Sequence, residues 1–312
     1  AGMTFACSLA MRSAHPQSRV GYAAGNDVQD SGMNVAQGRL WVVATPIGNL
    51  DDLSPRAAEV LRTVGLIAAE DTRHSALLLA RVGSRAPCIA LHEHNERDQV
   101  AHLLERLQQG IDIALISDAG TPLVSDPGYR LVRAARDAGI CVSPVPGPCA
   151  AIAALSVAGL ASDRFVFEGF LPAKASARRE RIGQLVAEAR TLIFYESSHR
   201  ILETLRDLVA VFGSERQAVI ARELTKVFET VISGSLAQLE ARVAADANQQ
   251  RGEFVVMVAG ASGEQADATL AEGRRVFALL CEEMAPARAA RMAAAITGAP
   301  RKALYAPSTE SN

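Results

Sequence analysis

Short apolar runs alternate with amphipathic segments along the first half of the chain, from Leu40 onward. The segment 97–109, for example, carries apolar residues at i, i+3, i+4 and i+7, which is helical spacing. Strands that alternate with helices indicate a parallel sheet covered by helices on both faces. The runs predicted to form strands are 40–44, 66–69, 88–92, 113–116 and 140–145.

Cap and turn residues predict where the helices begin. Ser54 followed by Pro55 is typical of a helix start, because Pro at the first position loses no hydrogen bond. By the same pattern, Asp126 is predicted to cap a helix that opens with Pro127. The segment 148–159 is almost entirely Ala, Ile, Leu and Val, so we expect that helix to be buried.

The second half predicts a mixed α/β sheet layered with helices near 175–189, 199–212 and 235–245. Ser235 and Gln238 form a capping box for the last of these helices. The strands are expected at 165–169, 192–195, 218–221, 230–233 and 254–258.

The C-terminal tail predicts two short helices around a glycine turn, which suggests a helix-turn-helix. Val276, Leu279 and Leu280 form an apolar stripe, and Pro286 opens the second helix. The charged residues between 285 and 305 are all basic: Arg288, Arg291, Arg301 and Lys302. This local excess suits contact with phosphates, and it equally suits a small solvated helical cap.

Four regions follow from these patterns. Residues 1–39 are polar, lack a sustained period and are expected to be a disordered leader. The other three are an N-terminal α/β domain with a parallel sheet at 40–161, a mixed α/β domain at 162–262 and the helix-turn-helix-like module at 270–306.

Composition excludes several classes of protein. The 312 residues are 49% hydrophobic and 21% charged, as in soluble globular proteins, with a net charge of −2. Five scattered cysteines without a C-x-x-C pair favour a reducing compartment, here the cytoplasm, over a disulfide frame or a zinc site. No apolar run approaches the roughly 20 residues that span a bilayer.

Candidate chemistry gathers where the strands end. Asp118 lies just beyond the strand 113–116, where open α/β sheets bind ligands. The chain lacks G-x-G-x-x-G, a P-loop and G-x-S-x-G, which excludes a diphosphate cradle and a serine hydrolase. His92-Glu93-His94 puts two imidazoles on one face of a strand, but without an evident third ligand we favour polar contacts over a metal.

Seven sequence blocks resemble the tetrapyrrole-methylase (class III) superfamily of S-adenosylmethionine-dependent enzymes, and within it the branch that acts on small-subunit ribosomal RNA. The departures are Cys149, where Ser is common, and Ser198, where Pro is common. The blocks, of which Ser117–Gly128 is the most specific, are Thr45–Leu50, Glu70–Arg73, Ser117–Gly128, Pro146–Pro148, Phe194–Ser197, Ala221–Lys226 and Gly252–Val255.

This resemblance implies methyl transfer to the ribose 2′-oxygen of a cytidine in the decoding centre of 16S ribosomal RNA, by a homodimer that needs no metal. The cofactor, S-adenosylmethionine, is expected in a cleft between the two α/β domains. The implied cofactor contacts are Pro46, Ser117, Asp118, Ala119, Gly120, Thr121, Pro122, Pro146, Gly147 and Tyr195. The candidate catalytic residues are Asp118, Glu196 and Lys226, and the candidate RNA contacts are Arg73, His94, Asn95, Arg200, Arg222 and Lys226.

Two alternatives stay open. A methylase of a tetrapyrrole precursor would share the fold, but such relatives resemble a glycine-rich first turn that Thr45–Leu50 replaces. A non-catalytic RNA-binding or ribosome assembly factor could have kept the fold. Cofactor binding together with turnover separates these possibilities.

Overall fold

The computed structural model describes residues 37–305, without the side chains of residues 263–267. Most of the predicted leader lies outside the described residues. Its last three residues are described, and two of them bind the first domain. The Gly38 N–H donates to the Leu107 carbonyl (2.7 Å), and the Arg39 N–H donates to the Asp112 carboxylate (2.7 Å).

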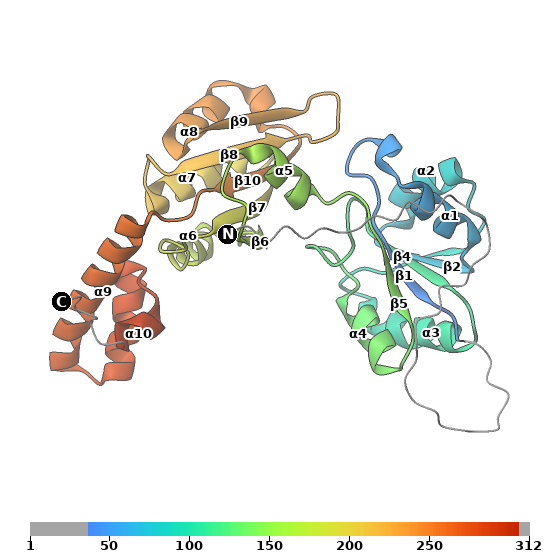
Figure 1. The fold of residues 1–312 in the computed structure, drawn as a ribbon, viewed down its shortest axis with the longest axis horizontal. Helices are drawn as coiled ribbons and strands as arrows, with labels where there is room; N and C mark the ends of the chain where they lie inside the picture. The colour runs from blue at the N-terminus through green and yellow to red at the C-terminus, as the bar shows by residue number, and fades with distance from the viewer. Residues whose placement is uncertain (1–36, 306–312) are drawn as a thin grey trace, which may run out of the picture. The chain divides into compact units, whose positions relative to one another are not determined.

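The first sheet is parallel throughout, as predicted, with strand order β3-β2-β4-β1-β5. Because successive strand residues point to opposite faces, the sheet has two apolar faces, and helices cover both (Figure 1). Helices α1 and α2 pack on one face, and α3 and α4 pack on the other. The strands are β1 (Leu40–Val43), β2 (Leu66–Ala69), β3 (Cys88–Ala90), β4 (Ile113–Ile116) and β5 (Val142–Val145). The helices are η1 (Leu50–Asp52), α1 (Pro55–Thr63), α2 (Thr72–Val82), α3 (Glu96–Gln108) and α4 (Tyr129–Asp137).

One of the two predicted caps in this domain is confirmed and the other is wrong. The Ser54 hydroxyl accepts a hydrogen bond from the Ala57 N–H (3.1 Å), and α1 begins at Pro55. Helix α4 begins only at Tyr129, and its N-cap is Gly128, at φ +119°. A glycine tolerates this left-handed backbone, so the chain enters the helix later than the Asp-Pro pattern suggested. Asp126 is therefore not the N-cap of α4.

Helix α5 (Ala150–Ala158) is buried along only one side, which corrects the expectation of a buried helix. Its residues Ala151, Ala154 and Leu155 pack against the second sheet. Ile152 and Val157 are 51% and 57% exposed. The sequence is apolar all round, but the helix covers a single sheet face and leaves its outer stripe to solvent.

The second sheet has the order β6-β7-β10-β8-β9, with β6 and β7 parallel and the other pairs antiparallel. Helix α5 covers one face, and α6, α7 and α8 cover the other. The capping box of α8 is confirmed. The strands are β6 (Phe165–Phe170), β7 (Thr191–Ser197), β8 (Gln217–Arg222), β9 (Thr230–Ser235) and β10 (Glu253–Val258). The helices are α6 (Ala175–Gly183), α7 (Ile201–Phe212), α8 (Leu236–Ala245) and η2 (Ala247–Gln250).

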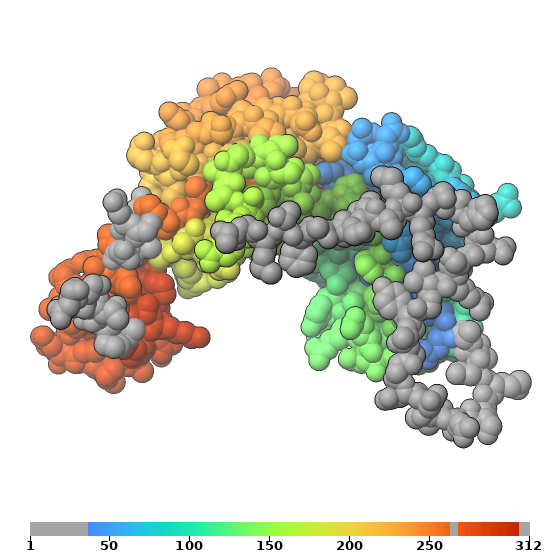
Figure 2. Space-filling model, viewed as in Figure 1, coloured from blue at the N-terminus to red at the C-terminus, as the bar shows by residue number. Residues whose placement is uncertain are grey.

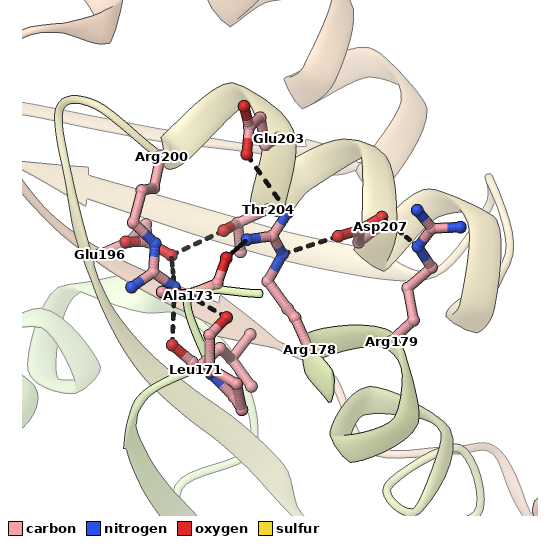
Figure 3. A network of polar contacts seen from close by, with 10 residues as sticks. Leu171, Ala173, Arg178, Arg179, Glu196, Arg200, Glu203, Thr204 and Asp207 are labelled. Carbon is pink, nitrogen blue, oxygen red and sulfur yellow. Dashed lines mark hydrogen bonds and ion pairs between the residues drawn. The ribbon is translucent and has the colours of Figure 1, made fainter. Parts of the chain in front are cut away.

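A buried arginine joins α6 to α7 (Figure 3). Arg178 has a side chain only 2% exposed, and its Nε donates to the Asp207 carboxylate (2.6 Å). Its remaining nitrogens bind the Ala173 carbonyl (3.2 Å) and Glu203 (3.4 Å), and Arg179 binds the other Asp207 oxygen (3.0 Å). Breaking such a buried pair costs about 3–5 kcal/mol. The network therefore fixes α6 against α7.

The C-terminal module consists of α9 (Gly263–Glu283), α10 (Pro286–Thr297) and η3 (Arg301–Tyr305). Its small core contains Ala290, Ala293 and Leu304, with Val276 and Phe277 packed against them. Leu279, predicted in the apolar stripe, is 51% exposed instead. Within residues 37–305, we find no helix with the length and apolar character that a membrane crossing requires.

Candidate functional site

A cavity of about 470 Å³ lies where carboxyl ends of strands from both sheets meet. In the first sheet it lies beside β4 and β1, at the point where the strand order reverses and open α/β sheets bind ligands. We call it the first pocket. Its lining includes Ile47, Glu70, Asp118–Thr121, Val124–Asp126, Phe170, Tyr195–Ser198, Leu224, Lys226 and Gly252–Val255.

The loop after β4 is held in place by hydrogen bonds to Thr45 and Pro148. Gly120, at φ +84°, exchanges two hydrogen bonds with Thr45: N–H to carbonyl distances of 2.8 and 3.1 Å. The Thr121 hydroxyl donates to the Pro148 carbonyl (2.9 Å). Leu123 and Ser125 also have positive φ values, +73° and +66°, a strain that typically marks functional sites. Residues 118–121 and 124–126 of this loop line the first pocket.

Three acids, Glu70, Asp118 and Asp126, line the first pocket and lie near enough to interact electrostatically. Asp118 accepts a hydrogen bond from the Asp71 N–H (3.0 Å). Burial, together with the neighbouring charges of Glu70 and Asp118, raises the pKa of Asp126 to about 6, against the opposing effect of a hydrogen bond with Ser117. Burial also raises the pKa of Glu70. Such an arrangement favours a positively charged ligand, because it offsets the repulsion among the acids.

Tyr195 forms an aromatic wall of this pocket. Its ring meets Phe167 and Phe170 edge-on, with centroids 4.9 and 5.7 Å apart. Its hydroxyl oxygen accepts a hydrogen bond from the Ala151 N–H (3.1 Å). Burial raises the pKa of Tyr195, so the phenol stays neutral at physiological pH.

Lys226 is held between two carboxylates at the edge of the pocket. Its Nζ lies 2.8 Å from Glu223 and 2.7 Å from Glu253. Burial lowers the pKa of Lys226, but the two carboxylates outweigh that effect and leave it raised. The ammonium group is therefore charged at neutral pH and is a poor proton acceptor.

Glu196 uses both carboxylate oxygens within the protein, and Figure 3 shows its contacts with Thr204 and Arg200. One oxygen accepts from the Ser197 N–H (2.8 Å), and the other accepts from the Thr204 hydroxyl (2.6 Å) and lies 3.3 Å from Arg200. Arg200 in turn donates to the Leu171 carbonyl (2.6 Å). The geometry therefore makes Glu196 an anchor for Arg200.

The other candidate RNA contacts are spread more widely. Arg222 is buried and donates to the carbonyls of Arg251 (2.6 Å) and Phe228 (3.2 Å). Arg73 is 90% exposed and pairs with Asp71.

His92-Glu93-His94 was expected on a strand, but it leads into a turn after β3, because that strand ends at Ala90. The Asn95 side chain closes this turn by accepting from the His92 N–H (2.9 Å), and His94 is exposed. Among the residues that the structure describes, no group of three potential metal ligands occurs.

A second cavity of about 530 Å³ adjoins the first and shares part of its lining. Pro46, Ser117 and Arg73 line it, as does Ser75. Of the predicted cofactor contacts, Pro122, Pro146 and Gly147 line neither cavity. Gly147 instead packs closely against the residue after the first strand, because a Cβ at this position would lie 3.0 Å from the Ala44 Cβ.

The sequence patterns missed Asp126 and Ser75. The Asp-Pro pattern at Asp126 predicts a helix cap, and this pattern gives no indication that the side chain lines a pocket. A serine within the first turn of a helix carries no signal of its own.

Fold and site together define a class. Residues 39–240 match the family model of tetrapyrrole (corrin/porphyrin) methylases, and residues 267–307 match that of the RsmI C-terminal HTH domain. Among solved structures, the methyltransferase CobJ is 22% identical, with TM-score 0.55 over 72% of this chain and 94% of that one. Uroporphyrin-III C-methyl transferase from Thermus thermophilus, complexed with S-adenyl homocysteine, is 16% identical, with TM-score 0.50 over 70% and 97%. These structures share the tetrapyrrole-methylase fold with this chain.

Curated relatives narrow the class. The protein named ribosomal RNA small subunit methyltransferase I in Xylella fastidiosa strain Temecula1 is 62% identical to this chain, and the match covers 86% of this chain and 98% of the relative. The protein of the same name in Pseudomonas aeruginosa is 58% identical, and the match covers 87% of this chain and 96% of the relative. The relative of that name in Escherichia coli O157:H7 is 54% identical, covering 86% and 94%. The chain belongs to the ribosomal RNA small subunit methyltransferase I family.

Proposed function

We propose that this protein transfers a methyl group from S-adenosylmethionine to the ribose 2′-oxygen of a cytidine in the decoding centre of 16S ribosomal RNA, within the bacterial cytoplasm. The observation that carries the proposal is the match over nearly the whole length of relatives named for methylation of small-subunit ribosomal RNA. The two adjoining cavities support it, because a methyl transferase must hold a cofactor and a substrate side by side.

The first pocket fits the cofactor. Its volume lies in the range of small-molecule sites. Residues 118–121 offer polar groups, and Ile47, Val124 and Val255 are apolar lining residues. The carboxylates Glu70, Asp118 and Asp126 complement a cation. The bound cofactor would supply an electrophilic methyl group on a positively charged sulfur.

Among the catalytic candidates, we propose Asp118 as the group that accepts the proton of the 2′-hydroxyl. Asp118 lines both cavities, so it stands between the proposed cofactor and substrate. Glu196 positions Arg200 through the ion pair described above. Lys226, held as an ammonium group, and the exposed Arg73 and His94 contact polar groups of the RNA.

We also propose a homodimer. The outer stripe of α5 exposes Ile152 and Val157. Exposed large apolar residues that lie on regular elements suit a subunit interface.

The test of the catalytic role is the substitution Asp118→Asn. The amide retains an oxygen for the Asp71 N–H but accepts no proton, so we expect kcat for methyl transfer to fall by roughly 10²–10⁴-fold. Transfer is measured with labelled cofactor on small subunits from cells that lack the gene. Asp137→Asn, an exposed residue of α4, is the matched control and should retain full activity. A folded Asp118→Asn protein with wild-type turnover would contradict the assignment.

A further inference from the structure

The hydroxyl of Ser75 is buried without a hydrogen-bond partner in the part of the chain that the structure describes. Ser75 lies in the first turn of α2, is 4% exposed, and its N–H donates to the Asp71 carbonyl (3.1 Å). Helix serines often satisfy their hydroxyls within the helix, as Ser156 does at the Ala153 carbonyl (2.7 Å). An unpaired buried hydroxyl costs about 1–3 kcal/mol, so its presence calls for a ligand.

Ser75 lines the second pocket and is not among the residues that line the first. The two pockets share part of their lining, so a ligand in the second pocket lies next to the proposed methyl donor in the first. The shared residues are Ile47, Asp118, Ala119, Lys226 and Glu253.

The charges of the second pocket disfavour a phosphate. Its two permanent cations are already paired: Arg73 with Asp71, and Lys226 with Glu223 and Glu253. Two carboxylates, Asp118 and Glu253, line the cavity themselves. An anion in this pocket would therefore meet like charges nearby and would gain no free permanent cation.

The walls of the second pocket suit a flat, neutral ring with polar edges. Apolar residues come from two elements: Pro46, Ile47 and Leu50 from the segment after β1, and Leu77 and Leu78 from α2. A base that leaves its stack is bound in this way, between apolar side chains, with hydrogen bonds along its edge.

We propose that the second pocket receives the nucleobase of the target nucleotide, with the Ser75 hydroxyl bonded to its polar edge. The hydroxyl donates to a ring carbonyl or accepts from an exocyclic amine. The ribose of the same nucleotide then lies at Asp118, where the pockets meet. This inference rests on the proposed function and adds Ser75 to it as a substrate-binding residue.

The kinetic test is Ser75→Ala. We expect kcat/KM for small subunits to fall by at least tenfold, equivalent to about 1.4 kcal/mol. The dissociation constant of S-adenosylmethionine should not change, and Tm should stay equal or rise, because the variant removes an unsatisfied group. Ser176→Ala, an exposed serine of α6, is the matched control. An unchanged kcat/KM would overturn the inference, and so would a loss that a lower Tm accompanies.

A second test needs no turnover. Methyl groups of leucine are observed by NMR while cytidine 5′-monophosphate or inorganic phosphate is added to the cofactor-bound protein. We expect the nucleotide to shift the methyl signals of Leu50 and Leu78, which line only the second pocket, and Ser75→Ala to weaken that response. Equal shifts from phosphate alone would show an anion site and overturn the inference.

The outcomes separate this inference from the proposed function. A wild-type protein that binds no cofactor and methylates no subunit would refute the proposed function. A wild-type protein that does both, with a Ser75→Ala variant that is equally active, would refute only the nucleobase pocket.

Discussion

Asp126 is a partly buried acid that lines the first pocket. It follows a strand-end loop and precedes a proline, which is typical of a helix cap, yet it lines the first pocket beside Glu70 and Asp118. Burial disfavours its charged form and raises its pKa to about 6. The charged Asp126 carboxylate is therefore expected to lower the stability of the fold while it favours binding of a positively charged cofactor.

The substitution Asp126→Asn should stabilise the fold and weaken cofactor binding at neutral pH. Between about pH 4 and pH 6 the folded protein binds a proton that the unfolded chain releases, so the free energy of unfolding falls as pH rises through this window. At pH 7.5 the variant should be more stable than wild type by roughly 1 kcal/mol, after allowance for solvent screening, and should bind S-adenosylmethionine more weakly. At pH 5.0 both differences should shrink. Urea unfolding and calorimetric titration at the two pH values measure them.

A variant with the same stability difference at both pH values would show that the charge of Asp126 is irrelevant. A suitable control is Asp98→Asn, an exposed acid on α3, which should alter neither the pH dependence nor cofactor affinity.

At the scale of elements, the sequence predicted the order and type of nearly every strand and helix. Apolar runs and caps act locally, so β1, α1 and the capping box of α8 were predictable within a residue or two. The errors arise where contacts between distant parts of the chain determine the burial or the end of a helix. Helix α5 is half exposed because only one sheet face lies beneath it, and α6 ends at Gly183, before the predicted 189.

The C-terminal module offers a prediction at the same scale. Arg288 and Arg291 on α10 are exposed, as are Arg301 and Lys302 of η3. If this surface binds RNA phosphates, the double variant Arg288→Ala/Arg291→Ala should bind small subunits more weakly. The slope of log affinity against log salt should drop by about 1–2, because fewer counterions are released. Filter binding across a salt series measures both quantities.

The matched control for that experiment is Arg133→Ala/Arg136→Ala, which removes two charges from α4 and should leave the slope unchanged. An unaltered slope in the α10 variant would count against an RNA role for the module.

For the whole molecule, the sequence established the fold class but left the pockets only partly predicted. The Ser117–Gly128 block identified the family and placed Asp118, because strand ends of a parallel sheet converge. It did not show that the Glu196 carboxylate binds Thr204 and Arg200. Nor did it show that the Ser75 hydroxyl lines the second pocket without a partner among residues 37–305. Such facts depend on residues distant in sequence, and periodicity carries no information about them.

The most direct test of the account is the transfer of labelled methyl from S-adenosylmethionine to small ribosomal subunits from cells that lack this gene, followed by mapping of the labelled nucleotide. We predict label on the ribose of a single cytidine in the decoding centre of 16S ribosomal RNA, dependent on Asp118. Label on a base or elsewhere in the RNA would contradict the proposed substrate, and label on a tetrapyrrole precursor instead would leave the fold and cofactor in place and refute the proposed function.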